Sequence, residues 1–138
     1  MDLQKDPAFE NLCILICDDD AAILKIIEHI LGQLGAAAVH STRSPRMALQ
    51  LLKEPVKKPF DLFICDWMMP EMSGLDVLKN VRNVGLQTPF VMLTGKATSD
   101  AVSQAASEGV DAYIAKPFSA DEVQRKIKTV MRRTRNRR

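Results

Sequence analysis

The sequence lacks a hydrophobic run long enough to cross a membrane. A membrane-spanning helix needs about 20 consecutive apolar residues, and the apolar run at 12–17 (LCILIC) is far shorter. The first residues, MDLQKD, lack the basic start and the apolar stretch of a secretory signal. We therefore expect a cytoplasmic protein that does not insert into membranes.

Cysteine is too rare and too irregularly spaced for a disulfide framework or a zinc site. The three cysteines are Cys13, Cys17 and Cys65, and no two of them form a CxxC pair. All three lie in apolar runs, so we predict buried, reduced thiols.

Aromatic residues are also scarce, at 5% of the 138 residues, and none lies in the basic block at the end of the chain. Residues 125–138 carry eight Lys or Arg and no acid, which leaves a net charge of −6 on the other 124 residues. Without aromatic rings to stack on bases, this block is typical of a solvated helix end. Nucleic-acid binding through the block is the alternative, and we do not expect it.

The chain has the length and composition of one globular domain, in which apolar runs of strand length alternate with segments of helical periodicity. The predicted strands are 12–17, 36–40, 62–65, 89–93 and 112–115. The predicted helices lie between Asp20 and Gly35, and at 45–52, 75–84, 100–108 and 120–131. Such alternation predicts an α/β fold with a parallel sheet and helices on both faces. The helix at 100–108 has the thinnest apolar face, and we expect it to be the least firmly packed.

Several helix ends carry recognisable signals. Asp20 and Ser44 are predicted N-caps, and Gly35 is a predicted C-cap. The apolar spacing in the first two helices assigns Ile26 and Met47 to the faces that pack against the sheet.

Polar side chains follow four of the predicted strands directly: Asp18 and Asp19, then Asp66, Thr94 and Lys116. Because right-handed crossovers bring the carboxyl ends of parallel strands to one edge, we expect these groups to converge in one crevice. Converging carboxylates repel one another unless a cation lies among them. Oxygen ligands favour magnesium, with manganese as a possible substitute.

Such a pocket suits phosphoryl transfer, which depends mainly on positioning and charge neutralisation. An Asp carboxylate can act as the nucleophile and become an acyl phosphate. Asp66 is our candidate, since it is the single acid after the central predicted strand.

Three motifs in this order, DDD at 18–20, DWMMPEMSG at 66–74 and KPF at 116–118, carry a family resemblance. The chain resembles the receiver domain of bacterial two-component response regulators, of the single-domain chemotaxis type. The resemblance covers about residues 11–131, with a polar leader at 1–10 and a basic tail at 132–138. It implies a doubly wound, flavodoxin-like sheet with strand order 2-1-3-4-5.

The resemblance implies a role for each polar group. Asp66 would accept a phosphoryl group from a phosphohistidine on a histidine kinase or histidine phosphotransfer protein. Asp19 would bind magnesium directly, Asp18 largely through water, and Asp66 and the backbone carbonyl of Met68 would supply further ligands. Lys116 would contact the phosphoryl group.

The resemblance also implies a switch. Thr94 would turn its hydroxyl onto the phosphate, Tyr113 would rotate inward, and the face built from the fourth helix, fifth strand and fifth helix would change for an output protein. Pro117 would follow a cis peptide bond. Met68 and Lys96 occupy the positions that tune phosphorylation and hydrolysis rates.

These features predict a signalling phosphoacceptor with self-catalysed transfer and slow autodephosphorylation rather than an enzyme. A phosphorelay intermediate is the main alternative. An aspartyl-phosphate hydrolase is disfavoured because Met68 stands where such enzymes commonly have a second acid. A nucleotide or flavin module is disfavoured because three acids, instead of a glycine-rich loop, follow the first strand.

Overall fold

The structure is a computed structural model that describes residues 3–54, 59–95, 103 and 105–136. Lys96 and most of the first half of the predicted helix at 100–108 lie outside the described residues. Within that helix, residues 103 and 105–107 are helical and Ala105 is buried, which agrees with a thin apolar face.

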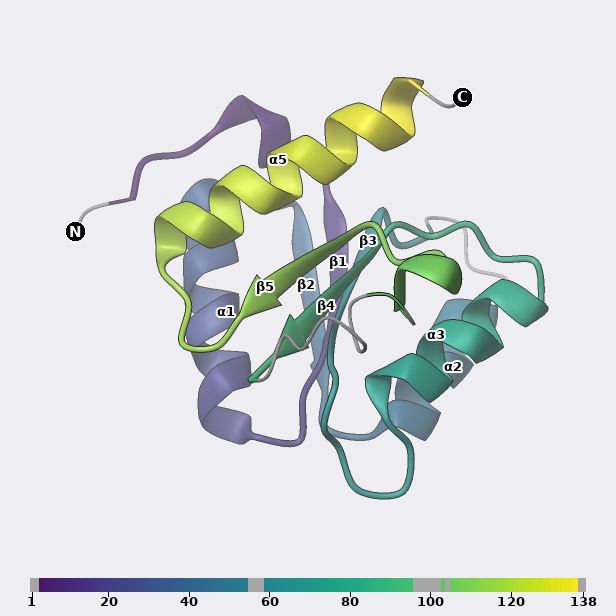
Figure 1. The fold of residues 1–138 in the computed structure, drawn as a ribbon. Helices are drawn as coiled ribbons and strands as arrows, with labels where there is room; N and C mark the ends of the chain where they lie inside the picture. Colours follow the sequence, from purple (N-terminus) through teal and green to yellow (C-terminus); the bar gives the residue numbers. More distant parts are fainter. Residues whose placement is uncertain (1–2, 55–58, 96–102, 104, 137–138) are drawn as a thin grey trace.

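The five strands form one parallel sheet in the order β2-β1-β3-β4-β5 (Figure 1). Their bounds are β1 Cys13–Cys17, β2 Ala38–Thr42, β3 Leu62–Asp66, β4 Phe90–Thr94 and β5 Ala112–Ala115. The predicted fold and strand order are confirmed. Every residue of β1, β3 and β4 is buried, which explains why these strands are continuous apolar runs.

Strand ends differ from the prediction in two informative ways. β2 begins two residues later than expected, because the amide of Ala36 donates to Leu31 O and so belongs to the preceding helix cap. Asp66 and Thr94 lie within their strands, where they are in register with Leu93 and Ala115. The sheet itself therefore holds these two candidate residues.

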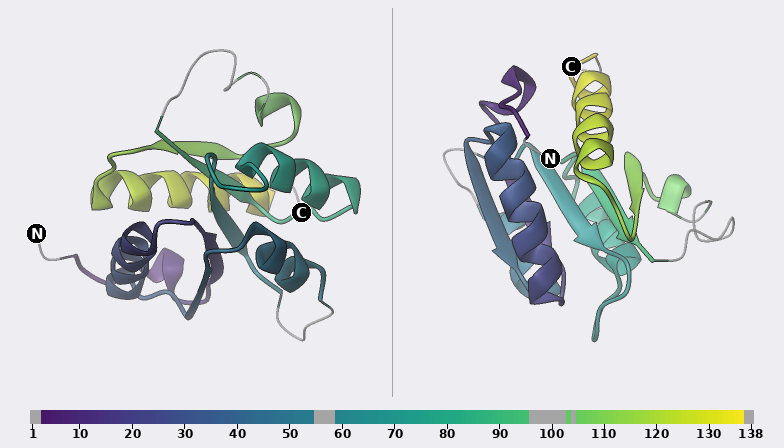
Figure 2. Two further views of the ribbon diagram at one scale, coloured as in Figure 1. Left: turned by 90° about the horizontal axis from the view of Figure 1, so that it is seen from below. Right: turned by 90° about the vertical axis from the view of Figure 1, so that its left-hand side faces the viewer.

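Helices cover both faces of the sheet. α1 (Ala21–Leu34) and α5 (Ala120–Asn136) lie on one face, and α2 (Pro45–Lys53) and α3 (Gly74–Asn83) lie on the other (Figures 1 and 2). The predicted caps are confirmed: Asp20 accepts from Ala22 N, Ser44 accepts from Met47 N, and Gly35 has a φ of 93°.

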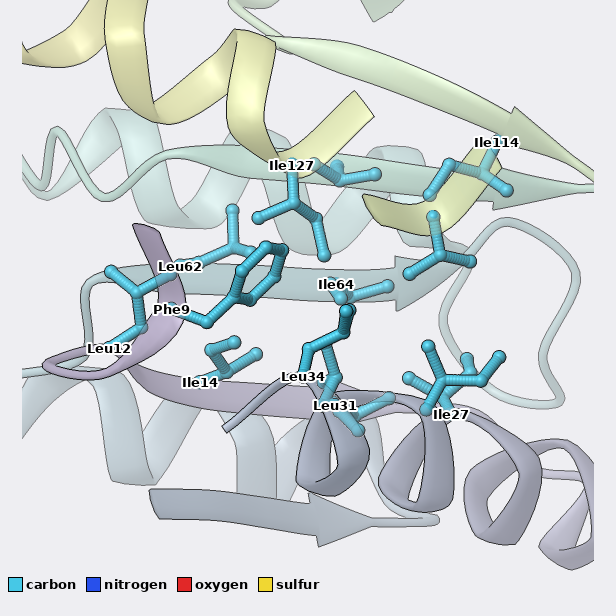
Figure 3. Packing of buried hydrophobic residues seen from close by; sticks show 14 of the residues in the cluster. Phe9, Leu12, Ile14, Ile27, Leu31, Leu34, Leu62, Ile64, Ile114 and Ile127 are labelled. Atoms are coloured by element: carbon cyan, nitrogen blue, oxygen red, sulfur yellow. The ribbon is translucent and has the colours of Figure 1, made fainter. Parts of the chain in front are cut away.

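Each face of the sheet has its own apolar core. Figure 3 shows the core between the sheet and the α1/α5 layer, where Phe9 lies among side chains of β1, β3, α1 and α5. The opposite core contains Phe63 and Phe90, whose rings meet edge to face at 4.9 Å. The three cysteines are buried and reduced, as predicted.

Two helical residues expected against the sheet are exposed instead. Ile26 is 49% exposed and Met47 is 44% exposed. The stripe that α1 buries is narrower than its apolar spacing suggested and consists of Leu24, Ile27, Ile30, Leu31 and Leu34. Successive helical residues are about 100° apart, so the neighbour of a buried residue can face solvent.

The predicted polar leader is packed against the domain. Phe9 is fully buried in the α1/α5 core. Asp6 accepts hydrogen bonds from Gln124 Nε2 at 2.9 Å and Lys128 Nζ at 3.0 Å, both on α5. The hydrogen bond from Gln124, helped by the amide of Ala8 and by Lys128, lowers the pKa of Asp6 to about 2. The leader therefore joins the helix at the other end of the chain.

The C-terminal helix extends further than predicted. α5 continues to Asn136, so most of the basic tail predicted at 132–138 forms its last turns. Val123, Ile127 and Val130 are buried, as their spacing indicated. Neither α5 nor any other helix of the described chain combines the length and the apolar character that a membrane span requires.

Gly74 marks a close approach between α3 and the end of β3. Its amide donates to Trp67 O at 2.8 Å, and a Cβ at this position would lie 2.3 Å from Asp66 O and 2.7 Å from Met92 Sδ. The backbone contact cannot be relieved by a side-chain rotation. Glycine is therefore required for α3 to begin directly against the strand that carries Asp66.

We expect Gly74→Ala to lower the free energy of unfolding by roughly 3 kcal/mol, because the added methyl group forces the two elements apart. Urea denaturation measures this change. Gly32→Ala is the matched control, since a Cβ on Gly32 meets nothing within 4 Å, and it should raise the free energy of unfolding by about 0.5 kcal/mol or more. Equal effects of the two substitutions would contradict the close approach.

Candidate functional site

Three aspartates meet at the carboxyl edge of the sheet. Carboxylate oxygens of Asp18, Asp19 and Asp66 lie within 4.8 Å of one another. Asp18 is fully buried, Asp66 is 4% exposed, and Asp19 is partly exposed. They meet because β1 and β3 are neighbours in register, with Cys17 opposite Cys65 immediately before the acids. The predicted convergence of these carboxylates is observed.

Lys116 reaches this cluster from the loop after β5. Its Nζ donates to Asp18 Oδ2 at 2.9 Å and to Asp66 Oδ1 at 3.1 Å. Its backbone amide donates to Thr94 O at 2.8 Å, and the peptide bond to Pro117 is cis, as the resemblance implied. One ammonium group therefore bridges carboxylates from two different strands.

The electrostatics of the cluster favour a further cation. Burial, followed by the charge of Asp18, raises the pKa of Asp66 to about 6, although Lys116 acts in the opposite direction. Burial alone would lower the pKa of Lys116, but its hydrogen bonds to Asp18 and Asp66 outweigh burial and raise it. One ammonium group pairs with two of the three carboxylates, so negative charge remains in excess.

The donor set fits magnesium. It offers only oxygen atoms, which hard divalent ions prefer, and it supplies the small number of carboxylates that magnesium usually takes. Among the described residues, this is the one group of three or more His, Cys, Asp or Glu side chains close enough to hold a metal. The sulfur atom of Cys17, the residue before Asp18, packs against another sulfur atom instead: Cys17 Sγ lies 3.7 Å from Met69 Sδ.

Thr94 and Tyr113 lie on the two strands beyond Asp66. Thr94 ends β4 and is 4% exposed. Tyr113 lies on the edge strand β5 and is partly buried, and its hydroxyl group forms a hydrogen bond with the backbone of Ala106. Burial raises the pKa of Tyr113. The tyrosine thus links β5 to the helical segment at 105–107.

The two residues that follow Asp66 differ in their exposure. Met68 is 74% exposed. Trp67 is partly buried, packs against the α2/α3 core and donates its amide to Leu93 O. Lys96, the other residue expected to tune the rates, lies outside the described residues.

One contact at the site was not predicted. Arg43, which follows β2, donates from Nε to the backbone carbonyl of Asp19 at 3.0 Å. A single arginine after a strand carries no sequence signal for such a contact, because it depends on how the loops after β1 and β2 lie side by side.

Comparison with known proteins agrees with this geometry. The family model of the response regulator receiver domain matches residues 14–128. The chain therefore belongs to the response regulator receiver domain family. This defines a receiver domain of two-component signalling, and the phosphoacceptor role is general for the family.

The more particular similarity is to chemotaxis proteins. The chain is 35% identical to chemotaxis protein CheY-3 of Vibrio cholerae, over 90% of this chain and 95% of that protein. It is also 35% identical to chemotaxis protein CheY of Pseudomonas aeruginosa, over 87% of this chain and 96% of that protein. A solved response regulator receiver domain from Clostridium thermocellum superimposes with a TM-score of 0.83 at 28% identity, covering 92% of this chain and 99% of that one.

The raised pKa of Asp66 predicts a pH-dependent penalty on folding. Its pKa of about 6 lies above the ordinary value of 3.8, so its charge destabilises the folded state above pH 6, and the penalty disappears as the pH falls toward 3.8. In EDTA at about pH 8, Asp66→Asn should raise the free energy of unfolding by on the order of 2 kcal/mol.

Urea denaturation across this pH range measures the difference between wild type and variant. Excess magnesium should shrink it, because a bound cation removes the repulsion that the substitution relieves. A difference that is the same at about pH 4 and about pH 8 would contradict the assignment.

Proposed function

We propose that this chain accepts a phosphoryl group on Asp66 from a phosphohistidine on a histidine kinase or a histidine phosphotransfer protein. The observation that carries the proposal is the position of Lys116 Nζ, 3.1 Å from Asp66 and 2.9 Å from Asp18, beside a cluster of three carboxylates. An anionic phosphoryl group needs such fixed positive charge around its oxygens.

Asp66 is suited to act as the nucleophile. With a pKa of about 6, its carboxyl group is mainly ionised at neutral pH and needs no general base. In the transfer, a bond forms between a carboxylate oxygen of Asp66 and phosphorus while the P–N bond to the histidine breaks. The imidazole nitrogen keeps the electron pair of the broken bond.

The remaining groups of the site would bind the metal ion and neutralise the negative charge of the phosphoryl group. Asp19 would hold magnesium directly and Asp18 largely through water, and Asp66 and the backbone carbonyl of Met68 would complete the protein ligands, with manganese as a possible substitute. The ion, when bound, supplies positive charge that neutralises the phosphoryl oxygens. Lys116 would move its ammonium group onto the phosphoryl group from its present bridge between two aspartates.

The signal would leave through the face formed by β5, α5 and the helical segment before β5. The hydroxyl group of Thr94 would donate a hydrogen bond to the phosphoryl group. Tyr113 would turn inward and lose its contact with Ala106. Changes in these contacts would alter the face that an output protein binds. Transfer of the phosphoryl group onward in a relay is the alternative use of the same site.

Slow autodephosphorylation is the expected end of the cycle. Met68 is apolar and 74% exposed, so it cannot orient a hydrolytic water as an acid or amide would. This favours a signalling phosphoacceptor over a hydrolase with rapid turnover.

Incubation with acetyl phosphate and magnesium tests the proposal. Wild-type protein should form a phosphoprotein that is stable to acid and labile to alkali, whereas Asp66→Asn should form none. Asp20→Asn is the matched control, because asparagine caps a helix as well as aspartate does and Asp20 serves as the N-cap of α1. Stoichiometric labelling of Asp66→Asn, or loss of labelling in Asp20→Asn, would contradict the assignment.

The lifetime of the phosphorylated form should depend on the two rate-tuning positions. Met68→Asn should speed dephosphorylation, because an amide can orient the attacking water, and Lys96→Glu should change the rate because it reverses the charge of the side chain at the second rate-tuning position. Decay of the labelled protein after removal of acetyl phosphate measures both rates. Unchanged decay in both variants would show that these positions do not tune hydrolysis here.

A further inference from the structure

Arg43 makes a single polar contact in the described chain, and that contact is to a residue of the acid cluster. Its Nε donates to the backbone carbonyl of Asp19 at 3.0 Å. Among the described residues it forms no ion pair. The contact therefore restrains the loop between β1 and α1 rather than neutralising a side chain.

The segment that carries Arg43 is held firmly at both ends. Thr42 accepts the amide of Asp18 on its carbonyl, at 3.2 Å, and Thr42 Oγ1 accepts the amide of Ser44 at 3.1 Å. Ser44 in turn caps α2. The guanidinium group thus extends toward the neighbouring loop from a backbone segment that hydrogen bonds hold in place at the end of β2.

Asp19 is the member of the acid cluster with the fewest restraints. Asp18 is buried, bound by Lys116 and accepts the amide of Asp20 at 2.9 Å, and Asp66 lies within a strand. The carboxylate of Asp19 is partly exposed and has no hydrogen-bond or ion-pair partner in the described chain. Repulsion from the other two carboxylates therefore acts on a residue that could swing toward solvent.

We propose that Arg43 is a positioning residue for the metal site: by holding the carbonyl of Asp19, it keeps the Asp19 carboxylate next to Asp18 and Asp66 before magnesium binds. The inference rests on the proposed function, because it takes Asp19 as a magnesium ligand. Groups that orient metal ligands through hydrogen bonds raise metal affinity, because less of the binding free energy is spent on ordering the ligand.

The charge of Arg43 acts in the opposite direction. A guanidinium group near the site repels a divalent cation, so its removal by itself would tighten binding slightly. Arg43 lines an open hollow of about 360 Å³ together with Asp19 and Glu71, and solvent there screens its charge. We therefore expect the magnesium affinity that is lost with the orienting hydrogen bond to exceed the affinity that is gained when this repulsion is removed.

Arg46 provides a matched control for charge. It lies in the first turn of α2, has the same side chain, and pairs at 3.5 Å with Glu71, which lines the same hollow. It makes no contact with the acid cluster in the described chain. Arg46→Ala therefore removes one nearby positive charge and leaves the Asp19 loop untouched.

The test is a magnesium titration of the full chain, followed by Trp67 fluorescence and by isothermal titration calorimetry. Arg43→Ala should weaken magnesium binding by about 10-fold, the lower end of the effect of removing a group that orients a metal ligand. Arg46→Ala should leave the affinity unchanged or slightly tighter. Arg43→Lys should recover part of the affinity, since an ammonium group can donate to a carbonyl but lacks the planar geometry of guanidinium.

A second readout needs no metal. In EDTA, the amide of Asp20, which donates to Asp18, should exchange its hydrogen faster in Arg43→Ala than in Arg46→Ala, because the loop that contains Asp19 opens more often. A purely structural role for Arg43 would lower the melting temperature and leave the magnesium affinity equal to that of Arg46→Ala.

The outcomes separate this inference from the proposed function. Equal magnesium affinity in Arg43→Ala and Arg46→Ala, with a normal response in wild type that Asp19→Asn abolishes, would overturn the role of Arg43 alone. A wild-type protein without a magnesium response, or a response that survives Asp19→Asn, would overturn the metal site and the role of Arg43 with it.

Discussion

The bridge from Lys116 to Asp18 and Asp66 is the interaction on which the site depends. Two buried carboxylates from neighbouring strands would repel each other strongly in the absence of a cation. The ammonium group that separates them comes from the loop after β5, at the edge of the sheet. The sheet must therefore bring three strand ends together before the two carboxylates can be buried.

The strands fix the positions of the site residues more directly than the loops do. Asp66 and Thr94 are the last residues of their strands, so their backbones are fixed by pairing with β4 and β5. The start of α3 packs so closely on Asp66 that only glycine fits at residue 74. The nucleophile of the proposed reaction is thus held on a rigid support, whereas Asp19 lies in a loop and its backbone carbonyl accepts a hydrogen bond from Arg43.

Much of the site could be predicted because its residues follow strands directly. All strands of a parallel sheet end at the same carboxyl edge. Because the alternation of strands and helices predicts such a sheet, it also predicts that Asp18, Asp66 and Lys116 approach one another. Contacts between loops have no such rule. The hydrogen bond from Arg43 to Asp19 spans 24 positions and that from Gln124 to Asp6 spans 118, and neither has a periodic pattern in the sequence.

The sequence by itself determined the α/β class, the apolar central strands, the helix caps and the set of polar groups at the carboxyl edge. These follow from local rules: burial on both faces requires continuous apolar runs, and caps satisfy helix ends within a few residues. Only the tertiary structure decided that Phe9 enters the core, that Ile26 and Met47 face solvent, and that Lys116 bridges two aspartates. Each of those outcomes depends on which surfaces meet in space, a property that no short stretch of sequence contains.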